Sequence, residues 1–481
     1  MNNITKDNKK SCTIDSSERC AALLPWSKVG LIKVLLLSII CGSYLYLALA
    51  QDLCLIVPEL VLASAVIVCL LTLLCYLSAK HDAYGQMGCR QQRRVFYLLL
   101  LLALLVRLMF LMRPAELSDD VYRYLWDGLQ LLSGYNPYAA APQNIAVTDS
   151  ARLFLQPLIN HPQLVTIYPP AAQLLFAVSG GTLVGWKLLL CLLDLGSCVV
   201  LAQLLLRLGR SPWWLSIYAL HPLVVLEGAA SAHVDIAALS FVLFSLWFVV
   251  ATNTAACHRR PILTLLAALC LAVAVMVKLF PLLFVPFIYL LLPPQQRRLF
   301  VAVLGISCVA LVLPFLPQIV NATATLQLYV ANWEFSGYLF RWLRSSLNSG
   351  LAARLLLLVV FGLVVASNWW ILRRHGANLR SVLRSCLAIL LCFLLLTPTL
   401  HPWYALYLTA FLPLAATPSA ITMSWSVLLS YQVVAGYRLS GLWQESSLLS
   451  FYIFLVPVAA SLLMGGVSLW RKRCQIRWAR L

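Results

Sequence analysis

Long apolar runs recur along almost the whole chain, and short polar stretches separate them. From Leu31 onwards many runs approach or exceed the roughly 18 to 20 residues that cross the hydrocarbon of a bilayer. They lie at about 31–50, 55–78, 95–112, 185–206, 212–229, 234–252, 262–276, 279–293, 299–316, 351–372, 381–397, 403–416, 420–437 and 449–470. This pattern predicts an all-α polytopic membrane protein with about 12 to 14 transmembrane helices.

One further apolar run, at about 168–182, does not fit a simple crossing. It is short, it opens on a Tyr-Pro-Pro sequence, and it ends on a Gly-Gly pair. A full crossing here would also place Arg207 and Arg210 on the outer side, although basic clusters mark cytoplasmic loops. We therefore interpret this run as a re-entrant or interfacial segment that is buried in protein.

Basic residues set the predicted direction of the chain, because cytoplasmic loops carry an excess of Lys and Arg. The clusters lie in the N-terminal segment, around Arg90, at Arg207 and Arg210, at 258–260, at 297–298, at 373–374 and at 471–473. The first apolar run has no small-residue cleavage site after it, so we expect a retained helix and not a signal peptide.

The resulting domain organisation is simple. We expect a cytoplasmic tail at 1–28, a single transmembrane domain at 29–470, and a basic cytoplasmic tail at 471–481. Two long loops, 113–165 and 317–350, then lie on the external side. Both termini are predicted to be cytoplasmic.

Composition agrees with this interpretation. Hydrophobic residues make up 62% of the chain and charged residues only 11%, far from the roughly 25% charged residues of soluble domains. The net charge of +19 resides largely in the short loops, where it acts as a topology signal, so we expect no nucleic-acid partner. Most of the 15 cysteines lie inside apolar runs without paired or metal-ligand spacing, which predicts no disulfide framework.

Acidic residues gather on the external side of this topology, most densely in the stretch that begins SDDVYRYLWDG. Its serine is a good helix cap, the first turn would carry Asp119 and Asp120, and the helix would end near Gly134. Asp119, Arg123 and Asp127 then follow one another at i, i+4 spacing. The pattern predicts an amphipathic interfacial helix with carboxylates and an arginine on its polar side.

Two interpretations of this helix remain open from spacing alone. A carboxylate could take the proton of an acceptor hydroxyl, and an arginine could hold a phosphate oxygen. Alternatively, the helix is a solvated interface element with ordinary i, i+4 ion pairs and a belt of aromatic side chains.

Further polar residues are predicted at the external ends of later spans. Glu227, His233 and Asp235 share a tight turn, Lys278 precedes a Phe-Pro pair, and His401 opens another turn. Ordinary loop polarity is the alternative, although ionisable groups at membrane depth are costly and seldom idle. His233 and Asp235 have the side chains of metal ligands, but two residues do not make a site. The sequence therefore predicts no certain cofactor, and a divalent metal has no support from ligand spacing.

Asp194 stands apart, because it lies near the middle of a predicted span and the sequence identifies no partner for it. Buried charge and broken helices are also typical of transporters, so a transporter or flippase of a lipid-linked substrate is the alternative function. Against that alternative, charge is otherwise scarce inside the spans and no repeated pair of broken helices is visible.

Five strings in order resemble a known family. They are SDDVYRYLWDGLQLLSGYNPY, HPQLVTIYPPAAQLLFA, HPLVVLEGAASAHVDIAAL, VKLFPLLFVPF and LHPWYALYLTAFLPL, which together span about residues 112–416. The chain resembles bacterial GT-C glycosyltransferases, in particular the polyprenyl-phosphate-mannose-dependent mannosyltransferases and their uncharacterised relatives. The resemblance implies a GT-C helical bundle whose first external loop carries a catalytic acidic motif. Ala232, before His233, stands where many relatives have glycine.

The resemblance also implies an activity. It implies transfer of a sugar, mannose as the best guess, from a polyprenyl-phosphate donor to a hydroxyl of a lipid or glycan acceptor, with inversion. Asp119 or Asp120 would be the general base. The residues expected to bind substrate are Arg123, Tyr124, Trp126, Asp127, Asn136, Tyr168, His233, Asp235, Lys278 and His401. The enzyme would sit among the lipids of a bacterial inner membrane with its active face in the periplasm.

Overall fold

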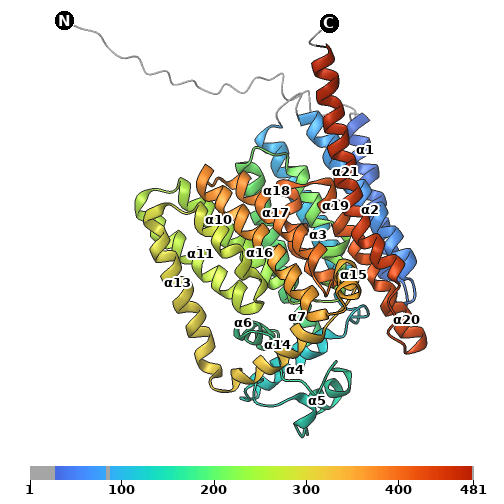
Figure 1. The fold of residues 1–481 in the computed structure, drawn as a ribbon, viewed down its shortest axis with the longest axis vertical. Coiled ribbons are helices and arrows are strands. Elements are labelled where there is room, and N and C mark those ends of the chain that lie inside the picture. The colour runs from blue at the N-terminus through green and yellow to red at the C-terminus, as the bar shows by residue number, and fades with distance from the viewer. Residues whose placement is uncertain (1–27, 83–86, 479–481) are drawn as a thin grey trace, which may run out of the picture.

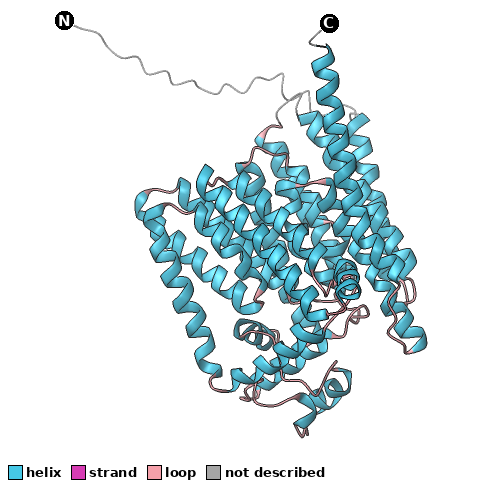
Figure 2. Ribbon diagram, viewed as in Figure 1, coloured by secondary structure: helices cyan, strands magenta, loops and turns pink. Residues whose placement is uncertain are grey.

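The computed structural model describes residues 28–82 and 87–478, and helices make up almost all of these ranges (Figures 1 and 2). Within them there is no β-strand, and only isolated β-bridges join Thr399 to Phe335 and Ser336. The predicted all-α class is confirmed. The predicted tail at 1–28 lies outside the described residues except for Lys28, where the first helix begins.

Nine of the described helices are long and apolar enough to cross a membrane. They are α1 (Lys28–Leu49), α2 (Val57–Asp82), α7 (Leu183–Arg207), α10 (Asp235–Thr254), α11 (Arg260–Val277), α13 (Pro294–Val312), α16 (Gly350–His375), α17 (Leu379–Leu396) and α21 (Ser447–Trp478). A further long helix, α3 (Cys89–Met109), carries several arginines. The chain is therefore a multi-pass membrane protein, as predicted.

Four of the predicted spans are broken into short helices. The run at 212–229 becomes Pro212–Leu215, α8 (Ser216–Ala219), α9 (Pro222–Val224) and a π-helical turn Val225–Ala230. The run at 279–293 becomes Phe280–Phe284 and α12 (Val285–Leu291), and the run at 403–416 becomes Pro402–Ala405 and α18 (Leu406–Ala415). The run at 420–437 becomes α19 (Pro418–Ser426), Val427–Tyr431 and α20 (Gln432–Ser440). Three of these four runs contain a proline, which lacks an N–H and ends regular helix, whereas the run at 420–437 contains none. Irregular backbone at this depth is tolerated where protein surrounds it.

The apolar run predicted to be re-entrant forms α6 (Pro170–Val178), which has nine residues. This length is well short of the roughly 20 residues that a crossing needs. The helix packs instead against α4 (Asp120–Leu132), the helix of the acidic motif.

The two predicted external loops lie together at one end of the bundle. Figure 1 shows α4, α5 (Ser150–Leu155) and α14 (Asn321–Asn332) at this end, opposite the C-terminal end of α21. Asn321 Nδ2 donates to the Tyr138 carbonyl at 2.9 Å and so ties one loop to the other. Basic clusters meet at the opposite end, where Arg380 donates to the Leu208 carbonyl at 2.9 Å.

The interior of the bundle contains the partner of Asp194. Its two carboxylate oxygens accept from Arg107 Nε and from the Tyr218 hydroxyl, each at 2.5 Å. Arg107 also donates to the Ala219 carbonyl at 2.8 Å. A buried charge of this kind is tolerated because an opposite charge and further hydrogen bonds compensate for its lost hydration. All cysteines with described side chains are free thiols.

Candidate active site

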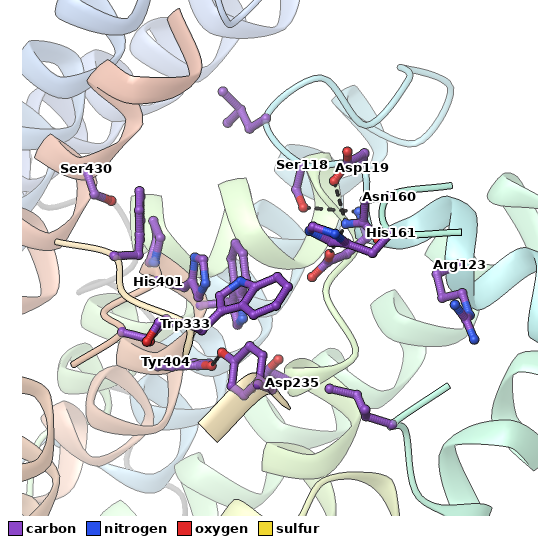
Figure 3. A pocket seen from close by; sticks show the side chains of 18 of the residues that line it. Ser118, Asp119, Arg123, Asn160, His161, Asp235, Trp333, His401, Tyr404 and Ser430 are labelled. Carbon is purple, nitrogen blue, oxygen red and sulfur yellow. Dashed lines mark hydrogen bonds between the residues drawn. The ribbon is translucent and has the colours of Figure 1, made fainter. Parts of the chain in front are cut away.

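A cavity of about 1980 Å³ opens at the end of the bundle that carries α4 and α14. Its wall joins segments far apart in the chain, from the turn before α2 to the turn after α20, and Figure 3 shows many of its side chains. The predicted site residues on this wall are Asp119, Asp120, Arg123, Tyr168, Asp235, Lys278 and His401. Those away from the wall are Tyr124, Trp126, Asp127, Asn136 and His233.

The two candidate bases stand at the start of α4. The helix begins at Asp120 and Asp119 is its N-cap residue, so the first turn starts one residue later than predicted. Asn160 Nδ2 donates to Oδ1 of both carboxylates at 2.8 Å, and Figure 3 shows this residue beside Asp119. Asp119 is exposed, whereas the Asp120 side chain is 22% exposed. The two carboxylates are therefore bridged but differ in their access to water.

Asp120 is the carboxylate with the altered acidity. Burial raises its pKa to about 6, and repulsion from Asp119 adds to the rise. The hydrogen bond from Asn160 and the positive charge of Lys278 act in the opposite direction. An aspartate with a pKa near 6 is mostly ionised at neutral pH and is a stronger base than an ordinary aspartate.

Arg123 and Asp127 form an ion pair inside the protein. Arg123 Nε donates to Asp127 Oδ1 at 2.9 Å, and Nη1 donates to the Leu164 carbonyl at 2.9 Å. Gln173 Nε2 donates to the other Asp127 oxygen at 3.2 Å. The alternative interpretation of α4 as a solvated element therefore does not hold at these positions, because α6 and the preceding loop cover them. Figure 3 shows Arg123 apart from Asp235 and His401.

Aromatic packing fixes α4 against α6. The Tyr124 ring stacks on Phe176 at 4.8 Å between centroids and meets the Tyr168 ring edge-on at 5.0 Å. A Cβ on Gly128 would lie 2.5 Å from the Phe176 carbonyl oxygen, so this close approach requires glycine. Trp126 is buried as well, which is not the position of a membrane-belt aromatic. Tyr168 alone among these residues reaches the cavity wall.

Asn136 holds the first external loop to the second and lies away from the cavity wall. Its Nδ2 donates to the Phe315 carbonyl and to Gln318 Oε1, both at 3.2 Å. Its Oδ1 accepts from the Tyr138 amide at 3.0 Å, which closes a turn at Asn136-Pro137. The structure thus gives Asn136 a structural contact, and its predicted contact with substrate stays a prediction.

A positive charge is fixed on the cavity wall by Lys278. Its Nζ donates to Asp235 Oδ1 at 2.7 Å and to Oδ2 at 2.6 Å, and the side chain is 23% exposed. The ammonium also lies 5.1 Å from the centre of the Tyr404 ring. Asp235 begins α10 and Lys278 follows α11, so the packing of these two helices brings the pair together.

A column of stacked rings forms another part of the site. The His233 ring stacks on Trp403 at 3.9 Å, Trp403 on His401 at 4.3 Å, and His401 on Phe335 at 4.7 Å. Burial lowers the pKa of His401 to about 3, and Lys278 adds to the fall. His401 is therefore a neutral ring at physiological pH.

Sequence reasoning missed several residues of the wall. Asn160 directly precedes one of the motif strings and Trp403 lies inside another. Their positions next to these strings could have identified both as candidates. Tyr329 lies in α14 and Trp333 directly follows this helix. No sequence pattern indicated that either residue belongs to the site. The Tyr329 hydroxyl meets the Tyr404 hydroxyl at 2.6 Å.

The family follows from comparison of the sequence with known proteins. A family model described as alpha-(1→6)-mannopyranosyltransferase, N-terminal domain (MptA/B family) matches residues 34–294, more than half of the 481-residue chain. The chain belongs to this mannosyltransferase family. The predicted resemblance to polyprenyl-phosphate-mannose-dependent GT-C enzymes is confirmed, and an enzyme is favoured over the transporter alternative. No curated protein and no solved structure matches the chain.

In this mannosyltransferase the matched segment supplies only part of the cavity. Asp120, Asp235 and Lys278 lie within residues 34–294, whereas Trp333 and His401 lie after them. Both parts of the chain are therefore needed to form the wall. Among the residues that the structure describes, no group of three or more His, Cys, Asp or Glu side chains could hold a metal ion.

Proposed function

We propose that this enzyme transfers a mannosyl group from a polyprenyl-phosphate donor to a hydroxyl acceptor, with Asp120 as the general base. The observation that carries the proposal is the position of Asp120 on the cavity wall, together with its pKa near 6. A base with such a pKa is both ionised and effective near neutral pH. Asp119 is the weaker candidate because it is more exposed.

The cavity wall suits a lipid-linked donor. Part of the wall is apolar and is formed by side chains of α14, α16 and α17: Leu326, Leu357, Leu358, Phe361, Phe393 and Leu396. A polyprenyl chain remains in the hydrocarbon of the bilayer, so its sugar phosphate has to enter beside apolar side chains. Of the two predicted cations on the wall, Lys278 is the one that would face the phosphate, because its side chain is 23% exposed whereas that of Arg123 is 7% exposed.

The chemical step follows from these positions. The acceptor oxygen attacks the anomeric carbon while its proton passes to the Asp120 carboxylate. The bond between the anomeric carbon and the phosphate oxygen breaks, and the polyprenyl phosphate leaves with the electron pair. Lys278 stabilises the negative charge that develops on this leaving group. A single displacement of this kind inverts the anomeric centre. Tyr168 and His401 would form the walls around the sugar.

Replacement of each candidate base tests the assignment. We expect Asp120→Asn to lower mannosyl transfer by about a hundredfold or more, since general base catalysis contributes roughly 10² to 10⁴. Asp119→Asn should retain much more activity. The assay supplies purified protein with radiolabelled polyprenyl-phosphate-mannose and a membrane lipid extract.

Asp149→Asn is the matched control, because Asp149 lies in the same external loop but not on the cavity wall. Its amide would still cap α5. Wild-type transfer by the Asp120→Asn variant would remove Asp120 as the base, whatever Asp149→Asn does.

We also propose that the cavity faces the periplasm and that both termini are cytoplasmic. The basic clusters at the opposite end of the bundle support this orientation. A cysteine at Tyr135, which is 58% exposed beside the cavity end, should react with an impermeant reagent from outside. A cysteine at the exposed His375 should not react. Labelling of His375→Cys alone would reverse the orientation.

A further inference from the structure

Tyr407 is a residue of the cavity wall whose hydroxyl has no partner. The residue is only 1% exposed, yet it forms part of the wall. Among the residues that the structure describes, it is the one tyrosine whose buried hydroxyl makes no hydrogen bond. A buried hydroxyl without a partner costs free energy, because it has given up its bonds to water and gained none in return.

Neighbouring tyrosines on the same wall do have partners. The Tyr329 and Tyr404 hydroxyls meet each other at 2.6 Å, and the Tyr431 hydroxyl donates to Glu227 Oε1. The polar groups of this region are therefore generally paired within the protein. Tyr407 is the exception that needs a reason.

Aromatic packing holds the Tyr407 ring without satisfying its oxygen. The ring lies 4.7 Å from the Phe280 ring and 6.2 Å from the Phe284 ring, measured between centroids. Phenylalanine side chains offer no donor and no acceptor, and a trapped water needs about two to four polar partners. These contacts fix the position of the ring and leave its O–H group available.

The hydroxyl end of Tyr407 lies near the ion pair on the wall. The Asp235 carboxylate acts electrostatically on this hydroxyl, and Lys278 donates to both oxygens of the same carboxylate. These two bonds leave one N–H of the ammonium group for a ligand. One region of the wall therefore holds two donors for an anion, an N–H of Lys278 and the O–H of Tyr407.

The apolar part of the wall leads to the same place. The Phe280 ring contacts Tyr407 and also Phe393, which lies 4.8 Å away between centroids. Phe393 in turn lies 5.9 Å from Phe361. A row of rings thus runs from the side chains of α16 and α17 to Tyr407. A lipid chain that packs on this row would bring its phosphate to the two donors.

We propose that Tyr407 donates a hydrogen bond to the phosphate of the lipid-linked donor and, with Lys278, forms its phosphate subsite. This inference rests on the proposed transfer of mannose from a polyprenyl-phosphate donor. When the bond between the anomeric carbon and the phosphate oxygen breaks, its electron pair stays on that oxygen. The hydrogen bond strengthens as this negative charge develops. Tyr407 keeps its proton throughout, so none of its covalent bonds changes.

Burial makes this contact more favourable. A hydroxyl that is open to water exchanges one hydrogen bond for another when a phosphate binds, and the net gain is small. The Tyr407 hydroxyl has no such bond to lose, so the phosphate supplies an acceptor where none was present. Binding includes a small shift of the wall side chains that shield this oxygen.

Tyr407→Phe separates this role from a purely structural one. It removes the hydroxyl oxygen and keeps the ring against Phe280 and Phe284. Loss of an unpartnered buried polar atom should leave the midpoint of thermal unfolding in detergent unchanged or higher. We nevertheless expect kcat/KM for polyprenyl-phosphate-mannose to fall about tenfold or more, since a hydrogen bond to a charged phosphate is lost. Wild-type kcat/KM in this variant overturns the proposal.

Polyprenyl phosphate, the leaving group, is a second probe of the subsite. The concentration that halves mannosyl transfer should rise about tenfold in Tyr407→Phe. Unchanged inhibition would remove the phosphate contact. Inorganic phosphate should inhibit much less than polyprenyl phosphate, because it lacks the chain that the apolar wall holds. Equal inhibition by the two compounds would contradict a lipid-linked source of the phosphate.

Tyr44→Phe is the matched control. The Tyr44 hydroxyl is buried as well, but it donates to the Leu220 carbonyl at 2.9 Å and lies away from the cavity wall. Its removal should lower the thermal midpoint, because the carbonyl loses its partner, and should leave kcat/KM near the wild-type value. An equal loss of kcat/KM in both variants would show that the effect is not specific to the phosphate.

The wild-type protein distinguishes the two ways of failing. If it transfers no mannose from polyprenyl-phosphate-mannose, the proposed function is wrong and the role of Tyr407 falls with it. If the wild type and Tyr407→Phe transfer mannose equally well, the proposed function stands and the role of Tyr407 alone is wrong.

Discussion

Lys278 donates to both carboxylate oxygens of Asp235, at 2.7 and 2.6 Å. The Asp235 side chain is almost completely buried, whereas Lys278 remains 23% exposed on the cavity wall. Asp235 therefore fixes the direction of the ammonium group and leaves part of it open to a ligand. A fixed charge of this kind loses little freedom when a phosphate binds, which favours its use as a phosphate partner.

Removal of this charge should weaken the use of the donor. We expect Lys278→Gln to lower kcat/KM for polyprenyl-phosphate-mannose by about tenfold to a hundredfold, because a hydrogen bond to a charged group contributes roughly 1.5 to 3 kcal/mol. Initial rates over a range of donor concentrations measure the effect. Arg152→Gln removes a charge from the first external loop, away from the cavity wall, and should change kcat/KM little. Equal effects of both substitutions would contradict a specific phosphate contact.

Transfer should depend on pH through Asp120. Because a general base has to be ionised and the pKa of Asp120 is about 6, kcat/KM should rise about tenfold per unit below pH 6. It should level off above about pH 7. The measurement is kcat/KM between about pH 4.5 and 8.5. A profile that is flat through pH 6 would contradict the assignment.

Asn160→Ala should move the acidic limb of this pH profile. The amide of Asn160 donates to ionised Asp120 at 2.8 Å and lowers its pKa. Without this hydrogen bond the carboxylate holds its proton more tightly, so the limb should move to higher pH. The pH profile of the variant under the same assay measures the shift. A downward shift in this variant would show that the amide does not stabilise the ionised form.

Ala232→Gly should stabilise the protein. Alanine at φ +59° is strained, and glycine adopts this conformation freely, which is worth about 1 kcal/mol before the entropy of the unfolded chain is counted. Thermal unfolding in detergent should show a higher midpoint than for the wild type. Ala230→Gly, in the preceding π-helical turn, is the control and should lower the midpoint. A fall with both substitutions would show that the strain at 232 is absent.

Asp194→Leu should strongly destabilise the bundle. It leaves the Arg107 charge buried without its partner, and breaking a buried ion pair typically costs about 3 to 5 kcal/mol. The double variant Arg107→Met with Asp194→Leu should recover much of the loss, because both charges are then gone. The folded fraction after heating in detergent measures each variant. A double variant no better than the single one would contradict a simple charge effect.

Much of the fold could be predicted because a membrane span is a run of consecutive apolar residues, which is visible in the sequence. Runs of about 20 apolar residues predicted α7, α10 and α16 within a few residues, and the short run at 168–182 was recognised as too short to cross. The breaks within 212–229 were harder. Hydrophobicity reports burial and not helix continuity, so His221-Pro222 alone hinted that this span is irregular.

The site was predictable only where its residues are close in sequence. The acidic pair at 119–120 was found from local charge, but the partner of Asp194 lies 87 residues earlier in the chain. The inward direction of Arg123 depends on Leu164 and Gln173, which no helical spacing relates to it. Contacts between distant segments are set by packing, and a single sequence does not record them.

The division of the cavity wall at residue 294 has a consequence for how such an enzyme can change. The groups assigned to the reaction, Asp120 and Lys278, lie before this residue, and the aromatic surfaces of Trp333, His401 and Trp403 lie after it. Substitutions in the later part can therefore reshape the space offered to an acceptor while the reacting groups keep their places. Enzymes of this architecture can therefore change their acceptor through substitutions after residue 294 while the reacting groups before it stay the same.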